Sequence, residues 1–170
     1  MMEQLYTQTA IKRKVAQLAE DVVKQAKAAL HVHVIMDGAF MFAADFIRAY
    51  ECKISKVTFL HILRGYEGIT PHPPRLLFKW PRYTRGLNPH YTHLILDVCT
   101  ETGETLRFAK IFLDLELRGK AQLITCALVA NGRLPMDADK IGFVNTKHMF
   151  LTGYGMGPNR DMEAIYGIPK

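Results

Sequence analysis

The sequence predicts an α/β protein built on a mainly parallel, doubly wound sheet flanked by helices. Four apolar segments with the length of buried strands occur along the chain, and amphipathic helical patterns alternate with them. Crossover connections between parallel strands produce this alternation. The chain has 170 residues, 49% of them hydrophobic, which is enough for one sizeable core. We therefore expect a single domain over residues 1–170.

The first helix is predicted over residues 10–30. Its apolar residues form one stripe opposite charged side chains, namely Ile11, Val15, Leu18, Val22 and Val23. A strand, "HVHVIM", is expected next over 31–36. Asp37 and Gly38 interrupt it, and "FMFAADFIRAY" then predicts a helix over 40–50. We expect the Met and Phe side chains around this junction to pack in the core, namely Met36, Phe40, Met41 and Phe42.

A second core strand, "KVTFLHIL", is predicted over 56–63. Residues 64–91 follow with five prolines and no regular period, and loops of that length are usually functional or mobile. The remaining elements are a strand over 92–98, a helix over 104–118, a strand over 121–130 and a short strand near "FLTGY", 150–154, that closes the sheet.

Charge and composition narrow the class of partner. The formal charge of +6 favours polyanions, either phosphorylated metabolites or nucleic acid. No apolar run approaches the roughly 20 residues that span a bilayer, and the N-terminal residues lack a signal-peptide pattern. We therefore expect a cytoplasmic protein with no membrane partner. Cys52, Cys99 and Cys126 show no CxxC spacing, so reduced, mostly buried thiols are expected.

The stretch "DVCTETGETL" connects the predicted strand over 92–98 to the helix over 104–118. It lies at the edge where open parallel sheets bind ligands. Gly103 allows a tight turn, and the hydroxyls of Thr102 and Thr105 add donors to converging backbone N–H groups. The dipole of the following helix favours an anion at the same point. We interpret the stretch as a phosphate cradle, and an ordinary turn with a threonine N-cap is the alternative.

Acids at Asp97 and Glu101 flank the cradle, and the arrangement resembles the diphosphate-sugar signature of type I phosphoribosyltransferases. Three other segments are similar to parts of the hypoxanthine-guanine phosphoribosyltransferases. "VIMDGAFMFAADFIR" resembles their first loop and helix, "RGYEG" their mobile catalytic loop, and "KIGFVNTKHMFLTGYGMGPNRD" their base-binding segment. The resemblance covers nearly the whole chain in the right order. It also implies a small hood built from the terminal segments.

The resemblance implies transfer of ribose-5-phosphate from phosphoribosyl diphosphate to hypoxanthine or guanine in purine salvage, with Mg²⁺. Asp97 would contact Mg²⁺ and the ribose hydroxyls, and Glu101 would accept the purine N7 proton. The 5-phosphate would bind the cradle residues Glu101, Thr102, Gly103, Glu104 and Thr105. A purine nucleoside monophosphate is expected to bind the same pocket.

The resemblance assigns further roles along the chain. Asp37 and Gly38 fall in the diphosphate loop, and Phe150 and Leu151 in the base-binding segment, where the aromatic ring stacks on the purine. Gly65 and Tyr66 belong to the lid-like loop over 64–91, which would exclude water from the reacting sugar. The family also implies a homo-oligomer, either a dimer or a tetramer.

Four positions depart from the family's pattern. Val98 stands where the family has a second ribose-binding acid, and Gly157 where an aspartate helps to hold magnesium. Ala130 replaces a lysine that grips the purine 6-oxygen. Asp37 would repel a diphosphate about 4 Å away by a few kcal/mol at an effective dielectric constant near 20, unless magnesium lies between them. The alternative function is therefore a catalytically silent homologue that binds purine nucleotides as a regulator.

Two further patterns leave alternatives open. The segment "RLLFKWPRYTR", 75–85, interleaves basic and aromatic residues as single-stranded nucleic-acid sites do, so RNA is a possible partner. A lid or an oligomer contact fits the same residues. His31 and His33 share one face of a strand, but without a third ligand nearby we expect no metal site there. His90 and His93, beside a turn, are expected to be solvated.

Overall fold

The computed structural model describes residues 1–63, 66–67, 70–71, 75–76, 86–132, 138–147 and 149–169. Its main sheet has six strands, of which five run parallel and β6 pairs antiparallel with β3. In spatial order the strands are β6 (Arg75–Leu76), β3 (Ile54–Leu63), β2 (Leu30–Met36), β7 (Thr92–Thr100), β8 (Gln122–Asn131) and β9 (Lys140–Asn145).

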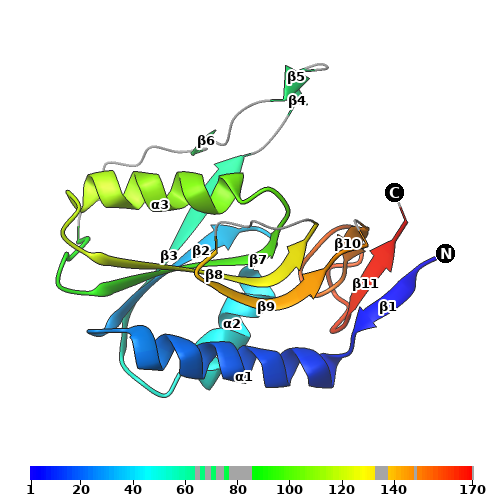
Figure 1. Cartoon of the computed structure of the whole chain (residues 1–170), viewed down its shortest axis with the longest axis horizontal. Coiled ribbons are helices and arrows are strands. Elements are labelled where there is room, and N and C mark those ends of the chain that lie inside the picture. The colour runs from blue at the N-terminus through cyan, green and yellow to red at the C-terminus, as the bar shows by residue number, and fades with distance from the viewer. Residues whose placement is uncertain are drawn as a thin grey trace.

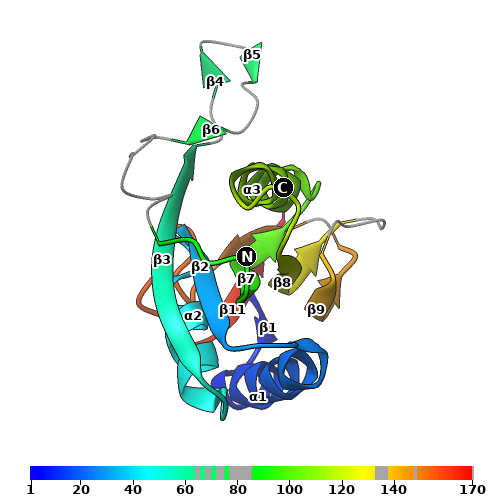
Figure 2. The ribbon, with the colours of Figure 1, turned by 90° about the vertical axis from the view of Figure 1, so that its left-hand side faces the viewer.

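Helices cover both faces of this sheet (Figure 1). α1 (Gln8–Gln25) and α2 (Phe40–Ala49) lie against one face, and α3 (Glu104–Glu116) lies against the other. Figure 2, turned by 90°, shows the same separation. The predicted doubly wound, mainly parallel α/β architecture is confirmed.

Two groups of buried side chains fill the space between sheet and helices. Val34 and Leu96 face α1 and α2, whereas their neighbours Ile35 and Ile95 face α3 and pack with Leu113. Successive strand residues point to opposite faces, so one continuous apolar run supplies both cores. This explains the continuous apolar runs of β7 and β8, whereas β2 alternates His31 and His33 with Val32 and Val34.

The helix predicted over 10–30 is shorter than expected. α1 begins after Thr7, whose hydroxyl caps it, and its apolar stripe is buried or half-buried as predicted. The helix ends at Gln25, because the backbone at Lys27, just beyond it, hydrogen-bonds to side chains of the sheet instead of to the preceding helical turn. The Lys27 N–H donates to Thr92 Oγ1 (3.2 Å) on β7. The chain therefore extends into β2 from Leu30 instead of continuing as a helix.

The prediction that "FLTGY" closes the main sheet is wrong, because β9 occupies that edge. β10 (Phe150–Thr152) instead pairs with β11 (Ile165–Ile168), which pairs with β1 (Glu3–Tyr6). The two chain termini thus form a separate three-stranded antiparallel sheet beside the end of the main one (Figure 1). This sheet is the hood of terminal segments that the resemblance implied.

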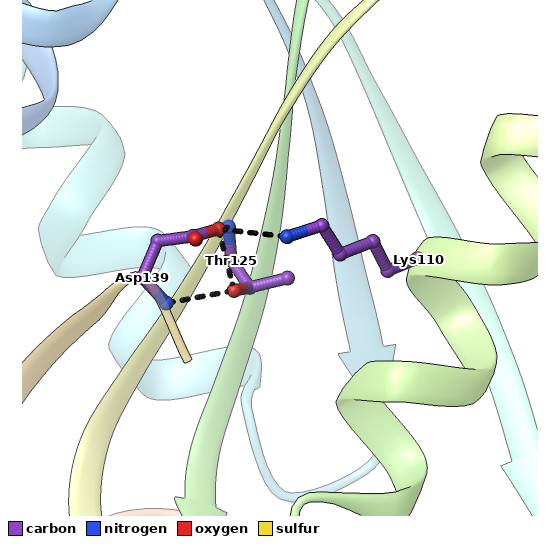
Figure 3. A network of polar contacts seen from close by, with 3 residues as sticks. All are labelled: Lys110, Thr125 and Asp139. Atoms are coloured by element: carbon purple, nitrogen blue, oxygen red, sulfur yellow. Dashed lines mark hydrogen bonds and ion pairs between the residues drawn. The ribbon is translucent and has the colours of Figure 1, made fainter. Parts of the chain in front are cut away.

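A polar network holds α3 onto the sheet (Figure 3). The carboxylate Oδ2 of Asp139, just before β9, accepts the N–H and the hydroxyl of Thr125 on β8, each at 2.8 Å. Lys110 of α3 reaches the same oxygen at 3.4 Å. Burial alone would raise the pKa of Asp139, but the hydrogen bonds from Thr125 and the Lys110 charge lower it overall. The charged carboxylate therefore links β8, β9 and α3.

Smaller expectations are wrong in part. Phe42 is buried as predicted, but Phe40 is 56% exposed. Cys126 is buried and Cys99 half-buried, whereas Cys52 is exposed, and none of these three residues forms a disulfide. Within the described parts of the chain, no helix has the length and apolarity to cross a membrane.

Only parts of the segment expected to form a lid, 64–91, are described. β4 (Tyr66–Glu67) pairs with β5 (Thr70–Pro71), and both views show this pair standing away from the main sheet. Of Tyr66 only the backbone is described. Gly65 and residues 77–85 lie outside the described part of the chain. The lid therefore stays a prediction, as do the alternatives for the basic aromatic segment.

Candidate active site

The loops that carry the predicted site leave the carboxyl ends of neighbouring parallel strands. Thr100 at the end of β7 pairs with Ala130 of β8, and Asn131 pairs with Asn145 at the end of β9. Asp37 directly follows β2, the other neighbour of β7. The ends of all four strands therefore lie along one edge, the usual ligand-binding edge of such a sheet.

The predicted phosphate cradle is the turn between β7 and α3. Gly103 is the N-cap of α3 and has a left-handed backbone, with φ 76° and ψ −7°. The cap is glycine, so the alternative of a threonine N-cap is wrong. Gly103 is buried while Glu101, Thr102 and Glu104 are exposed. The turn is therefore exposed at the positive end of the α3 dipole, where backbone N–H groups favour an anion.

Two asparagines that sequence reasoning missed hold Glu101 in place. Asn131 Nδ2 lies 2.8 Å from both Glu101 Oε1 and the Met149 carbonyl oxygen, and donates to each. Asn145 Nδ2 in turn donates to Asn131 Oδ1 at 2.8 Å. Both asparagines are buried. The network fixes the proposed base relative to the start of the predicted base-binding segment.

The only sequence signal for this pair is its position. Asn131 follows the apolar run "LITCALVA", and Asn145 follows "IGFV". Each asparagine therefore ends a strand of the parallel sheet, at the edge where ligands bind. Only the strand register shows that they face one another.

The predicted diphosphate loop packs closely against β7. Asp37 is exposed, and its peptide bond to Met36 is cis. A Cβ atom built on Gly38 would lie 3.2 Å from Val98 Cγ1, and one built on Gly155 would lie 2.5 Å from the Gly38 carbonyl oxygen. Side chains at these two glycines would push the loop away from the strand end. Gly38 therefore fits this position because it lacks a side chain.

The predicted base-binding residues lie on β10. Phe150 is 46% exposed, whereas Leu151 is buried at 7%. The turn that follows is anchored to α2, because the Tyr154 hydroxyl donates to Asp45 Oδ2 at 2.7 Å. Burial and this bond both raise the pKa of Tyr154, so the phenol stays protonated and keeps its donor. An exposed ring on a fixed strand can stack on a flat ligand.

No protein-family model matches the chain, and no curated protein matches it in sequence. Solved structures do match. A hypoxanthine-guanine phosphoribosyltransferase from Bacillus anthracis superposes with a TM-score of 0.80 at 22% sequence identity, and the match covers 98% of each chain. The chain has a phosphoribosyltransferase fold.

Two other solved structures have the same phosphoribosyltransferase fold, with similar TM-scores and sequence identities. A hypoxanthine phosphoribosyltransferase from Staphylococcus aureus matches with a TM-score of 0.77 at 20% identity, over 99% of this chain and 91% of that one. The Trypanosoma cruzi enzyme in complex with its product IMP matches with a TM-score of 0.76 at 20% identity, over 98% and 93% of the two chains. The predicted type I phosphoribosyltransferase architecture is therefore confirmed.

Within this phosphoribosyltransferase fold, three of the four departing positions have structural roles. Val98 is 3% exposed and belongs to the core beneath α1 and α2, and Ala130 is fully buried. A Cβ atom on Gly157 would lie 2.9 Å from Thr152 Oγ1, so the turn there is too tight for a larger side chain. Asp37 alone among the four is exposed with a charge.

The donors at this edge have the chemistry that magnesium prefers. Asp97 lies near the end of β7, 9% exposed, and Glu101 follows it in the turn. Mg²⁺ takes oxygen ligands and usually needs one or two carboxylates, with substrate phosphates and water completing the shell. The residues present fit such an ion, with Asp97 as the protein ligand.

At the opposite end of the same strands, the expectation for His93 is wrong, whereas His90 is exposed as expected. His93 is not solvated but fully buried, and it lies beside His31 and His33. The third histidine, which the local sequence did not reveal as a neighbour, comes from the adjacent strand β7. One ligand nitrogen from each ring lies within 4.8 Å of the others.

Proposed function

We propose that this protein is a purine phosphoribosyltransferase that transfers ribose-5-phosphate from phosphoribosyl diphosphate to hypoxanthine or guanine in purine salvage. The observation that carries the proposal is the turn from Glu101 to Thr105. It combines the left-handed Gly103, the start of α3 and a carboxylate held by Asn131. The fold supports the same class of reaction, because its solved relatives include hypoxanthine phosphoribosyltransferases.

The proposed chemistry assigns one task to each group at the cradle. As the bond between the sugar C1 and the diphosphate breaks, positive charge grows on the ribose, and the bond to purine N9 forms. Asp97 binds the ribose hydroxyls and Mg²⁺, and the backbone N–H groups of residues 101–105 hold the 5-phosphate. Glu101 accepts the proton from purine N7. When bound, Mg²⁺ neutralises charge on the leaving diphosphate.

Asn131 is the positioning residue in this scheme. Its amide donates to Glu101 Oε1 and so fixes the orientation of the carboxylate that accepts the purine proton. The same amide is bonded to the Met149 carbonyl, next to Phe150. The base-binding strand and the proton acceptor therefore move together.

The remaining assignments follow the resemblance. Phe150 stacks on the purine and the Leu151 backbone reads its edge. Asp37 and Gly38 belong to the diphosphate loop, where a bound Mg²⁺ would offset the repulsion between Asp37 and the diphosphate. Gly65 and Tyr66 belong to a lid over 64–91. We also propose a single domain over 1–170, a homo-oligomer (dimer or tetramer) and a cytoplasmic location.

The test is release of diphosphate from phosphoribosyl diphosphate with Mg²⁺, against hypoxanthine, guanine, xanthine and adenine. We expect release that requires an oxopurine. Glu101→Ala should lower kcat by about 10²- to 10⁴-fold, the usual contribution of a general base. Glu20→Ala, which removes an exposed carboxylate on α1, is the matched control and should leave kcat unchanged. Release that ignores the base, or survives Glu101→Ala, would reject the assignment.

A second candidate function is a catalytically silent regulator that binds purine nucleotides. Val98 favours it, because that side chain is part of the core and leaves Asp97 as the only acid of the pair. In the same assay a regulator releases no diphosphate with any base but still binds IMP or GMP. RNA binding through residues 75–85 is one form of this alternative, and fluorescence anisotropy with a labelled single strand tests it.

A further inference from the structure

Three buried histidines meet on the α3 side of the sheet, toward the amino ends of β2 and β7. His31 and His33 lie two residues apart on β2, and His31 pairs in register with His93 of β7. All three side chains are 0% exposed. We call these residues the three-histidine cluster. It lies at the opposite end of the strands from the phosphate cradle, which begins after Thr100.

The hydrogen bonds of the cluster indicate which nitrogen carries the proton on His93 and on His33. His93 Nε2 donates to the Asn88 carbonyl oxygen at 3.0 Å, so the neutral ring turns a lone pair on Nδ1 toward its neighbours. His33 Nε2 lies 2.8 Å from that Nδ1 and donates to it. The Thr58 hydroxyl lies 2.8 Å from His33 Nδ1 and 3.3 Å from His31 Nε2.

One nitrogen in the cluster has no hydrogen-bond partner among the described residues. His31 Nδ1 is buried without a hydrogen bond from any described residue. A buried polar atom left in this way costs about 1–3 kcal/mol. Burial also lowers the pKa of all three rings, that of His31 to about 3, so the cluster is neutral at pH 7. Neutral imidazole is the form that binds transition metals.

We propose that the three-histidine cluster binds one divalent transition-metal ion of the zinc class. Two histidines two apart on one strand, with a third on the adjacent strand, place three imidazoles on one face of the sheet. Their candidate ligand nitrogens lie within 4.8 Å of one another. Zinc bonds of 2.0–2.1 Å in a tetrahedral shell separate the nitrogens by about 3.3 Å, which small rotations of the rings can reach.

Metal binding does not require the cluster to lose a proton. The His33 proton moves from Nε2 to Nδ1 and is then donated to Thr58 Oγ1, while the Thr58 hydroxyl turns to the Val32 carbonyl, 3.5 Å away. His93 keeps its bond to the Asn88 carbonyl, the outer contact that commonly orients a metal-bound histidine. A water molecule completes the four-coordinate shell.

One neighbouring side chain, that of Lys56, should oppose metal binding. Lys56 of β3 lies close enough for its charge to contribute to the lowered pKa of His31 and His33. A cation in the cluster would be repelled by that ammonium group, so removal of the charge should tighten metal binding. A purely structural histidine cluster has no reason to respond in this way.

The site is independent of the proposed reaction. Its ligands are imidazole nitrogens, and it lies at the opposite end of the strands from the cradle. Imidazole selects zinc, copper, nickel and cobalt, whereas Mg²⁺ prefers oxygen. The ion would join β2 to β7 beneath the segment 86–91, which contributes the Asn88 carbonyl. We therefore infer a structural role for it.

The experiment titrates the full-length protein with Co²⁺ in the presence of excess Mg²⁺ and follows the visible absorption of tetrahedral cobalt. We expect one ion per chain and displacement by Zn²⁺. His31→Asn and His93→Asn should each weaken binding by at least about a hundredfold, since even loss of an outer contact costs up to that much. His90→Asn, an exposed histidine three residues from His93, is the matched control and should bind as the native chain does.

Lys56→Gln should tighten Co²⁺ binding about threefold or more at low salt. The proposal is overturned if the native chain binds no Co²⁺, or if His31→Asn and His93→Asn bind it unchanged. Should these variants fail to fold, ¹⁵N-histidine spectra of the native chain decide. Zn²⁺ must then shift the ring nitrogens of three buried histidines, and shifts confined to the exposed ones would overturn the proposal.

Discussion

The two ends of β2 and β7 carry opposite kinds of polar chemistry. At the carboxyl end, Asp37 and Glu101 lie in turns and are exposed. At the amino end, three histidines from the same strands are fully buried and contact one another, Thr58 and the Asn88 carbonyl. The carboxyl end is open to a charged ligand, whereas the amino end admits only a small ion or a proton.

This difference shows how the two regions obtain their properties. The cradle is local, since a left-handed glycine and the start of a helix within five residues create it. The three-histidine cluster is tertiary, because it exists only when β2, β3 and β7 are in register. The first should be sensitive to single changes in one turn, and the second to conditions that charge a buried ring.

The largest expected effect concerns α3, which begins at the cradle and covers the same face as the cluster. Asp139→Ala should lower the free energy of unfolding by about 3 kcal/mol, because it leaves the buried N–H and hydroxyl of Thr125 without their acceptor. Lys110→Ala, which removes only the exposed ion pair, should cost under about 1 kcal/mol. Urea denaturation measures both. Equal losses would mean that the ion pair, and not the buried acceptor, holds the helix.

The next expected effect is a loss of folding stability at low pH, which arises from the histidines at the amino end of the strands. His31 has a pKa of about 3 when folded, against 6.5 as the ordinary value. The unfolded chain therefore binds the extra proton below pH 6.5, and the stability that the neutral ring provides is lost as the pH falls toward 3. Each ring of this kind lowers the free energy of unfolding by about 1.4 kcal/mol per pH unit below that point.

Denaturation at pH 7.5 and 5.0 with a chelator present would measure this slope. His31→Asn should flatten it, while His90→Asn should not. A native chain whose stability is the same at both pH values would contradict the neutral, buried state of the cluster.

A substitution at Gly103 tests whether the cradle depends on this single turn. Gly103→Val should weaken the binding of IMP or GMP at least about tenfold, or 1.4 kcal/mol, because a β-branched residue rarely adopts a φ of 76°. Gly119→Val is the matched control. It places the same side chain at a φ of 64° near the other end of α3, with no atom within 4 Å. Calorimetric titration of both variants with IMP compares them, and equal affinities would refute the cradle.

Sequence reasoning recovers what short-range patterns encode. The apolar runs identify the strands, and "TETGET" identifies the turn whose N-cap is Gly103. It places the closing strand wrongly, since "FLTGY" pairs with the terminal strands and "KIGFVN" takes the sheet edge. No local sequence feature shows which of these two short segments joins the main sheet. Only the strands with which they pair distinguish them.

Asn131, Asn145 and the burial of His93 were missed for the same reason. Asn131 and Asn145 become functional candidates only because β8 and β9 bring them to one edge. His93 has the sequence surroundings of a loop histidine, beside Pro89 and Tyr91, yet it lies inside β7. The register between parallel strands decides both cases, and a crossover connection hides that register from any local pattern.

The most direct test of the central claim is a map of where a purine nucleotide binds. We would record ¹⁵N–¹H spectra of the native protein with and without IMP or GMP in the presence of Mg²⁺. We expect the largest shifts on the backbone N–H groups of Glu101 to Thr105, with smaller ones at Asp97 and Leu151, and none at the three-histidine cluster. Shifts confined to other segments, or no shifts at saturating nucleotide, would contradict a phosphate cradle at this turn.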